Sequence, residues 1–311
     1  MPTPRTVKVN SVDKTNAKIM TELDSGVIYD AIRFSFRNTG AANVNAPALN
    51  TLISDVVITM NGADQRTFNA MHGAACNSLF GAKWAPQGYA GGTNGVPNAN
   101  GEGRTHFVIL LREPRARLRE DSVDVETLGW KTKWLPKNKP LQITMTNLLG
   151  ANLDVEVEAE VRDGDDSDVR GPNRIIKWYS PDNVLGANPS TLNNWAKNVK
   201  AGDRFIQMSL FNSSGGKTVN AIRMEAGGGK FYEDITKASI VTQLLGSDLD
   251  PAGADAQANA LHLALDRYES LNDALPSFDS SLLKVTMSAA ANGESLISLI
   301  QRYGLPDGYN V

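Results

Sequence analysis

The sequence repeats itself, because three segments of its first half recur in the same order in its second half. The first pair is IRFSFRN at Ile32–Asn38 and IQMSLFN at Ile206–Asn212, which share alternating apolar residues, a central serine and a final asparagine. Alternation with a period of two is typical of a half-buried β-strand. Both segments are therefore predicted to be strands that end in a turn.

The second pair combines an alternating strand, a glycine turn and a helical stretch, at Val56–Gly81 and Val219–Gly246. In both copies a glycine of the turn, Gly62 or Gly227, is followed 19 positions later by the glycine that closes the helix. A glycine at that point fits a helix C-cap. The equal spacing indicates one structural unit present twice.

The third pair is LQITMT at Leu141–Thr146 and LKVTMS at Leu283–Ser288, with the same residue classes at all six positions. The offsets between the copies are 174, 165 and 142 residues, so they decrease along the chain. The first half therefore carries extra loop, and the Gly- and Asn-rich stretch Gly88–Gly103 accounts for some of it. Three matches in one order predict a duplicated unit of about 150 residues.

Composition favours a β-rich chain with a core of its own in each half. The 311 residues are 41% hydrophobic and 21% charged, and 27 Gly and 14 Pro interrupt short apolar segments. Helical spacing is confined to a few places, which we predict as inserted helices at Phe68–Phe80, Ile235–Leu245 and Ala254–Leu271. The polar stretch RDGDDSDVRGP predicts a linker at 163–172 between domains at 1–162 and 173–311.

These passages resemble the double jelly-roll major capsid proteins of tailless, membrane-containing phages, particularly the corticovirus type. The resemblance rests on VVITMNGADQRTFNAMHGAACNSLFG, its weaker copy AIRMEAGGGKFYEDITKASIVTQLLG, and LLKVTMSAAANGESLISLIQRYGLP. It implies an all-β fold of two tandem eight-stranded jelly-roll β-sandwiches with short inserted helices. No such passage is a catalytic signature, so the resemblance implies a structural protein and not an enzyme.

The resemblance also implies how such a chain acts. Three copies would form a homotrimer with a pseudo-hexagonal outline, and lateral contacts between trimers would build an icosahedral virus shell. The expected partners are the chain itself, penton or minor capsid proteins and an internal viral membrane. The expected location is the virion capsid, after synthesis in the host cytoplasm.

Charge and cysteine content exclude several other classes of protein. The 31 basic and 34 acidic residues give a net charge of −3, which provides no broad positive field, and we expect no sequence-specific binding of nucleic acid. The single cysteine, Cys76, excludes an intramolecular disulfide and a zinc site built on paired cysteines. The N-terminus lacks the apolar segment of a signal peptide, and no apolar run is long enough to span a bilayer.

The chain lacks the motifs of common catalytic sites. Its three histidines, His72, His106 and His262, have no metal-binding spacing and are interpreted as structural or surface residues. The sequence contains neither a Gly-x-Ser-x-Gly elbow nor a phosphate-binding glycine loop. No catalytic residue and no required cofactor is predicted.

One candidate metal site is a group of four carboxylates. Closely spaced oxygens on a loop can supply ligands for calcium, but the glutamate that completes an EF-hand is missing here. The simpler interpretation is a solvated linker, and the functional one is a Ca²⁺ site that stiffens the linker or a subunit contact. The residues are Asp163, Asp165, Asp166 and Asp168.

The main alternative is a tandem β-sandwich that binds carbohydrate or acts on polysaccharide. It would need exposed tryptophans and a groove with paired carboxylates. The acidic pair Glu156 and Glu158 is expected on the solvent face of a strand, and the tryptophans are expected to be core or interface anchors. The cluster Arg112, Arg115, Arg117 and Arg119, mixed with acids, is interpreted as a solvated loop or as intersubunit ion pairs.

Overall fold

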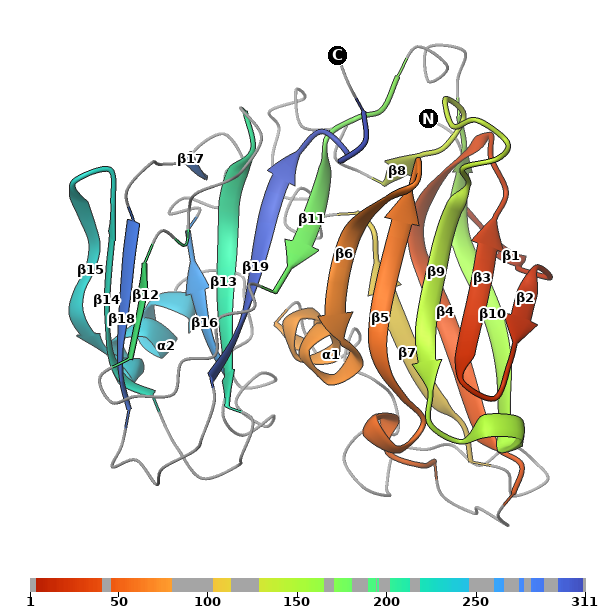
Figure 1. The fold of residues 1–311 in the computed structure, drawn as a ribbon, viewed down its shortest axis with the longest axis horizontal. Helices are drawn as coiled ribbons and strands as arrows, with labels where there is room; N and C mark the ends of the chain where they lie inside the picture. The colour runs from red at the N-terminus through yellow and green to blue at the C-terminus, as the bar shows by residue number, and fades with distance from the viewer. Residues whose placement is uncertain are drawn as a thin grey trace. The chain divides into compact units, whose positions relative to one another are not determined.

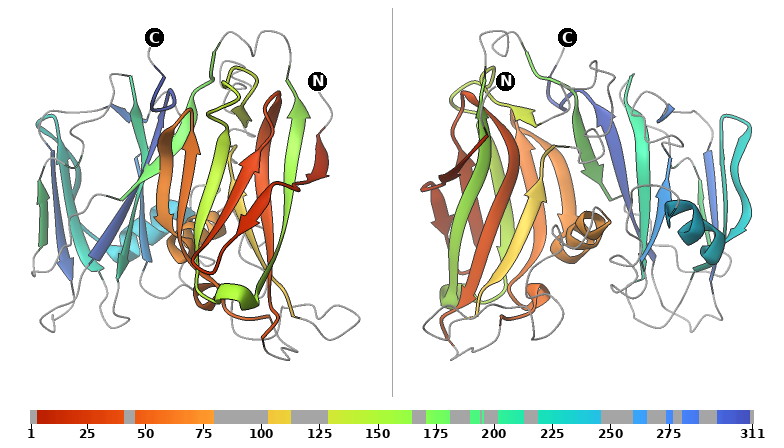
Figure 2. Two further views of the ribbon diagram at one scale, coloured as in Figure 1. Left: turned by 45° about the vertical axis from the view of Figure 1, so that its right-hand side comes forward. Right: turned by 180° about the vertical axis from the view of Figure 1, so that it is seen from behind.

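The computed structural model describes most of the chain. The described residues are 4–40, 46–79, 103–112, 129–164, 171–180, 190–193, 195, 202–212, 219–245, 260–265, 274–276, 281–287 and 296–309. The chain divides into two compact units, which are described separately below (Figures 1 and 2). Unit 1 is Met1–Ser78, Ala82–Ile176 and Leu305–Val311, and unit 2 is Leu79–Gly81 and Lys177–Gly304.

Unit 1 is built from two layers of antiparallel strands. One sheet has the order β1-β10-β4-β7, with β8 also paired to β4, and the other has the order β6-β5-β9-β3-β2. Figure 1 shows the second layer in front of the first. The strands are β1 (Arg5–Lys8), β2 (Val12–Lys14), β3 (Lys18–Leu23), β4 (Val27–Asn38), β5 (Ile53–Met60), β6 (Ala63–Asn69), β7 (Thr105–Leu110), β8 (Trp130–Lys131), β9 (Leu141–Asn147) and β10 (Leu153–Asp163).

Unit 2 repeats this arrangement. Its sheets have the orders β11-β19-β13-β16, with β17 also paired to β13, and β12-β18-β14-β15. The boundary between the units falls within β11, after Ile176. The strands are β11 (Ile175–Tyr179), β12 (Ser190–Asn193), β13 (Arg204–Asn212), β14 (Val219–Ala226), β15 (Gly229–Thr236), β16 (Ala260–Ala264), β17 (Leu275–Pro276), β18 (Ser281–Met287) and β19 (Leu296–Gly304).

The strand orders of the two units match position by position. If the eight main strands of each unit are numbered along the chain, one sheet has the order 1-8-3-6 and the other 2-7-4-5 in both units. The short extra strands β8 and β17 also agree, because both pair with the third strand. The short strand β2, which pairs with β3 and is not counted among the eight, has no counterpart in the described part of unit 2. Two four-stranded sheets in this order form a jelly roll. The predicted all-β fold of two tandem eight-stranded jelly rolls is confirmed.

The three repeated segments occupy equivalent places in the two units. Ile32–Asn38 lies in β4 and Ile206–Asn212 in β13, which are the third strands. Leu141–Thr146 lies in β9 and the described part of Leu283–Ser288 in β18, which are the seventh strands. The repeat visible in the sequence is therefore a repeat of structure.

The strand, turn and helix passage contains one strand more than we predicted. The glycine turn leads into a return strand, β6 or β15, before the helix begins. The helices are α1 (Ala70–Ser78) and α2 (Lys237–Leu245), so both start about two residues later than the spacing predicts. Gly62 and Gly228 have φ values of 76° and 79°, which an L side chain rarely adopts. The two tight hairpins depend on them.

The predicted helix at Ala254–Leu271 is wrong where the structure describes it. Residues 260–264 form the strand β16, which pairs with β13, and most of the remaining residues lie outside the described part. A strand that is buried on both faces has no polar alternation, so a short apolar run can be mistaken for a helix. No helix in the described part of the chain is long and apolar enough to cross a membrane.

Each unit has a core between its own sheets. In unit 1 the inward-facing residues of β4 are Ile32, Phe34 and Phe36, none more than 1% exposed. In unit 2 the equivalent strand β13 contributes Met208 and Leu210, both 0% exposed. The C-terminal segment of unit 1 is held by Gln65, whose Nε2 donates to the Asp307 carbonyl at 2.9 Å and whose Oε1 accepts from the Asp307 N–H at 2.8 Å.

Candidate functional site

The residues of the predicted calcium site are only partly described. Asp163 is the last residue of β10, and its side chain is 64% exposed and lies 2.9 Å from the guanidinium of Arg5. Asp165, Asp166 and Asp168 lie outside the described residues. Among the residues that the structure does describe, no group of three or more His, Cys, Asp or Glu side chains could hold a metal ion. The calcium site stays a prediction.

The histidines and the cysteine occupy three different environments. His72 lies on α1, and burial lowers its pKa to about 4, against a smaller opposing effect of Asp55. Cys76 is fully buried on the same helix. His106 is exposed on β7 and His262 is 3% exposed on β16. Cys76 is therefore out of reach of a substrate, whereas His72 is half-buried.

The structure brings together a buried polar group in unit 2 that sequence reasoning missed. His262 Nδ1 lies 2.8 Å from Ser209 Oγ, and Gln207 Nε2 donates to the same oxygen at 2.9 Å. Burial, followed by the positive charge of Lys237, lowers the pKa of His262 to about 3, so its imidazole is neutral at pH 7. A serine and a histidine at this distance could act in nucleophilic catalysis only if a substrate reached them, and Ser209 is 0% exposed.

Unit 1 contains the duplicate of this pair. Ser35 lies directly opposite His106 in the register of β4 and β7, as Ser209 lies opposite His262 in that of β13 and β16. The histidines are 156 residues apart, between the offsets of 165 and 142 that the second and third repeated segments show. HFVI at 106–109 and HLAL at 262–265 are thus a fourth repeated segment. The prediction of a helix over 260–264 concealed it.

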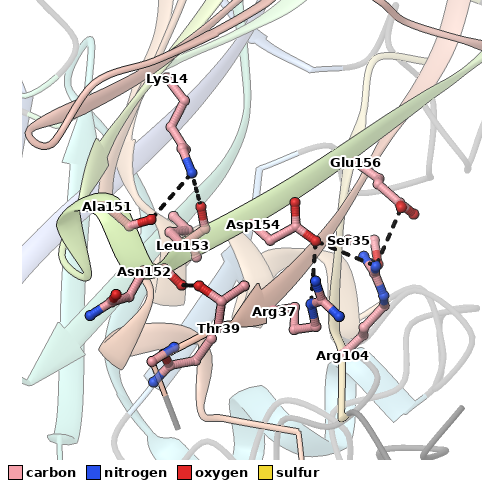
Figure 3. Close-up of polar contacts among 12 residues, drawn as sticks. Lys14, Ser35, Arg37, Thr39, Arg104, Ala151, Asn152, Leu153, Asp154 and Glu156 are labelled. Carbon is pink, nitrogen blue, oxygen red and sulfur yellow. Dashed lines mark hydrogen bonds and ion pairs between the residues drawn. The ribbon is translucent and has the colours of Figure 1, made fainter. Parts of the chain in front are cut away.

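The exposed face of the β1-β10-β4-β7 sheet in unit 1 carries a network of ion pairs (Figure 3). Arg104 contacts Asp154 at 3.5 Å and Glu156 at 3.3 Å, and Arg37 contacts Asp154 at 3.3 Å. Farther along the sheet Arg33 pairs with Glu160. Basic residues on β4 and just before β7 thus alternate with acidic residues on β10.

Positive and negative side chains are equal in number on this face. Alternation places four basic and four acidic side chains on the same side of the sheet, and Glu156 and Glu158 are exposed there, as predicted. A balanced face has no strong field for a polyanion. The set is Lys8, Arg33, Arg37, Arg104, Asp154, Glu156, Glu158 and Glu160.

Backbone carbonyl groups at the start of β10 accept hydrogen bonds from two neighbouring segments of the chain. Lys14 on β2 donates to the carbonyl oxygens of Leu153 and, at 3.4 Å, Ala151 (Figure 3). Thr39 Oγ1 donates to the Asn152 carbonyl at 2.9 Å. These bonds fix the start of β10, and with it the positions of the first acidic side chains.

Unit 2 contains a second group of charges, which is buried. Lys177 Nζ donates to Asp203 Oδ2 at 2.6 Å, and both side chains are at most 2% exposed. Arg302 lies 3.4 Å from the same oxygen and stacks over the ring of Tyr179, with 4.4 Å from the guanidinium carbon to the ring centroid. A charge taken out of water is tolerated only with such a partner.

Three of the described tryptophans are buried in the core. Trp130, Trp178 and Trp195 are at most 7% exposed, and Trp134 is half-buried, with its indole N–H donating to the Lys131 carbonyl at 2.8 Å. Trp84 lies outside the described residues, as do all members of the arginine cluster except Arg112. Among the described tryptophans none forms the exposed platform that a carbohydrate-binding site needs.

Comparison with solved structures identifies the class of fold. The chain is similar over its whole length to double jelly-roll capsid proteins of icosahedral viruses, as the sequence resemblance implies. No known protein family and no curated protein matches the sequence.

The individual neighbours come from unlike viruses. The major capsid protein P2 from bacteriophage PM2 has a TM-score of 0.71 and 12% identity, with 99% of this chain and 100% of that chain covered. The STIV MCP has a TM-score of 0.62 and 11% identity, with 98% and 97% covered. The PBCV-1 virus capsid protein has a TM-score of 0.59 and 10% identity, with 98% and 95% covered. At these identities the similarity shows the fold alone.

Proposed function

We propose that this chain is a structural major capsid protein that assembles as pseudo-hexagonal homotrimers into an icosahedral virus shell. The observation that carries the proposal is the presence of one jelly roll twice, with the same strand order, in a single chain. The similarity to capsid proteins over the full length of the PM2 and STIV chains supports it.

Duplication suits a shell for a geometric reason. Closed threefold symmetry around a chain with two similar domains presents six nearly equivalent domains at the rim, and six equivalent edges can tile a hexagonal lattice. Interfaces in permanent assemblies commonly bury about 2,000 Å² or more in total. The function is then assembly, which is driven by the burial of surface between copies and involves no catalysis.

The remaining expectations follow from the same proposal. The protein acts without catalysis and resides in the virion capsid after synthesis in the host cytoplasm. Its partners are other copies of itself, penton or minor capsid proteins and an internal viral membrane, and it binds no specific nucleic acid sequence. The charge balance on the exposed sheet of unit 1 supports the last point.

Molar mass in solution tests the proposal. Light scattering on the purified protein is expected to give about three times the chain mass of 33.5 kDa. A monomer that binds glycans on an array would instead support the carbohydrate-binding alternative. The described tryptophans do not favour that alternative, because none of them forms an exposed platform.

Calcium is proposed as a ligand of the group Asp163, Asp165, Asp166 and Asp168. If it binds there, millimolar Ca²⁺ raises the melting temperature and a chelator reverses the rise, because a ligand that binds only the folded state stabilises it. Changing Asp166 and Asp168 to asparagine should abolish the rise. An unchanged melting temperature in Ca²⁺ would end the calcium proposal and leave the capsid proposal intact.

A further inference from the structure

The sheet faces that point away from the two cores are covered to very different extents. In unit 2 the outward residues of β13, β16 and β19 are buried within one chain: Gln207 is 2%, Ser209 0%, His262 3% and Gln301 2% exposed. In unit 1 the residues at the equivalent positions are Arg33, Ser35, His106 and Glu158, which are half-buried or exposed. The strand register makes the two sets structural duplicates.

The helices show the opposite asymmetry. The two helices have nine residues each and begin at Ala70 and Lys237, so Ala75 and Cys76 on α1 correspond to Thr242 and Gln243 on α2. The two α1 residues are at most 2% exposed. Thr242 and Gln243 are exposed, as is Ser239 one turn earlier, because α2 buries only the side that carries Ile240 and Leu244. The helix is therefore covered in unit 1 and uncovered in unit 2.

Each unit thus leaves uncovered the surface that is buried in its duplicate. Unit 1 exposes a sheet face and unit 2 exposes a helix face, so a single chain carries one surface of each kind. A closed ring of identical chains needs two different surfaces that bind each other head to tail. Binding of the exposed sheet face of one copy to the exposed helix face of the next copy would satisfy that requirement.

We infer that the outward face of the β1-β10-β4-β7 sheet in one copy binds the exposed face of α2 in a second copy. The sheet face contributes Ser35, His106 and Glu158, and the helix contributes Ser239, Thr242 and Gln243. This inference rests on the proposed homotrimer and assigns its interface. The occupant is another copy of this chain, because the sheet face has balanced charge and α2 presents uncharged polar side chains that can bond to it.

Two substitutions test the inference, one on each surface. His106→Arg and Thr242→Arg each add a long charged side chain at an exposed position, while the cores of both units are left unchanged. Each variant alone is expected to be monomeric, with the mass falling from about 100 kDa to 33.5 kDa. The matched control is Glu233→Arg, at an exposed position on β15 outside both surfaces, which should remain trimeric.

Mixing the two variants distinguishes a head-to-tail interface from any other. The H106R chain keeps its α2 face and the T242R chain keeps its sheet face, so an equimolar mixture should form a dimer of about 67 kDa that cannot grow. Trimers of either variant alone, or a mixture that stays monomeric, would overturn the assigned interface. If the unsubstituted chain were itself monomeric, the proposed homotrimer would fail, which the mass of that control sample shows independently.

Discussion

The two jelly rolls have the same strand order but different chemistry on one sheet face. Their inward faces agree, since Phe34 in unit 1 and Met208 in unit 2 occupy duplicate positions at most 1% exposed. On the outward face, Arg33 in unit 1 corresponds to Gln207 in unit 2. The apolar alternation specifies the fold, and the outward residues are free to adapt to water or to a covering surface.

The positions of ion pairs show the same difference. Unit 1 has several pairs on its exposed sheet face, where solvent weakens them, and in its most buried pair, Arg162 with Asp30, the arginine side chain is still 18% exposed. In unit 2 the side chains of Lys177 and Asp203 are both out of water. Deletions of charge should therefore have unequal effects in the two units. Four predictions test that difference, beginning with the largest effect.

Removal of the buried carboxylate should have the largest effect. Asp203→Asn leaves the cations of Lys177 and Arg302 buried beside a neutral amide, and breaking such a pair costs about 3–5 kcal/mol of the free energy of unfolding. Urea unfolding at fixed protein concentration measures the loss. A loss below about 1 kcal/mol would show that water reaches this site.

A methyl group at Gly304 should act on the same site through sterics. A Cβ there would lie 1.7 Å from Asp203 Oδ1, so Gly304→Ala must displace the carboxylate. We expect a loss of about 1–3 kcal/mol, as in other overpacked sites. Gly229→Ala is the matched control, because its Cβ would meet only the Ala226 carbonyl at 3.5 Å. Equal melting temperatures for the two variants would refute the steric explanation.

Acid should destabilise the chain through its buried histidines. The pKa of His262 is about 3 in the folded protein and about 6.5 when unfolded, so between these values the unfolded state binds more protons. Stability therefore falls as the pH drops from about 6.5, by at most roughly 1.4 kcal/mol per pH unit for one such group. His262→Gln should reduce that slope in urea midpoints taken from pH 7 to pH 4, with a residual slope from His72. An unchanged slope would mean that folding does not lower the pKa of His262.

The smallest effect is expected for a surface pair in unit 1. Arg33 and Glu160 are 39% and 28% exposed, so Glu160→Gln should cost less than about 1 kcal/mol. The loss should shrink further in 0.5 M salt, since exposed pairs are screened. If this variant lost as much stability as Asp203→Asn, the contrast between the two units would not hold.

The sequence predicted the duplication because inward-facing residues must alternate in both copies, as Ile32 to Phe36 and Ile206 to Leu210 do. It could not predict β6 and β15, which are polar strands at a sheet edge in their own units and lack a clear alternation. His262 was misplaced on a helix because its strand is buried on both faces. Which outward face is covered depends on contacts distant in sequence, so no local pattern reveals the inferred interface.

Electron microscopy of the purified protein most directly tests whether chains with two similar jelly rolls form a pseudo-hexagonal trimer. Averaged end-on views should show six similar lobes around a threefold axis, with alternate lobes belonging to units 1 and 2. Single two-lobed particles, or twofold dimers at concentrations where a shell would form, would contradict the account.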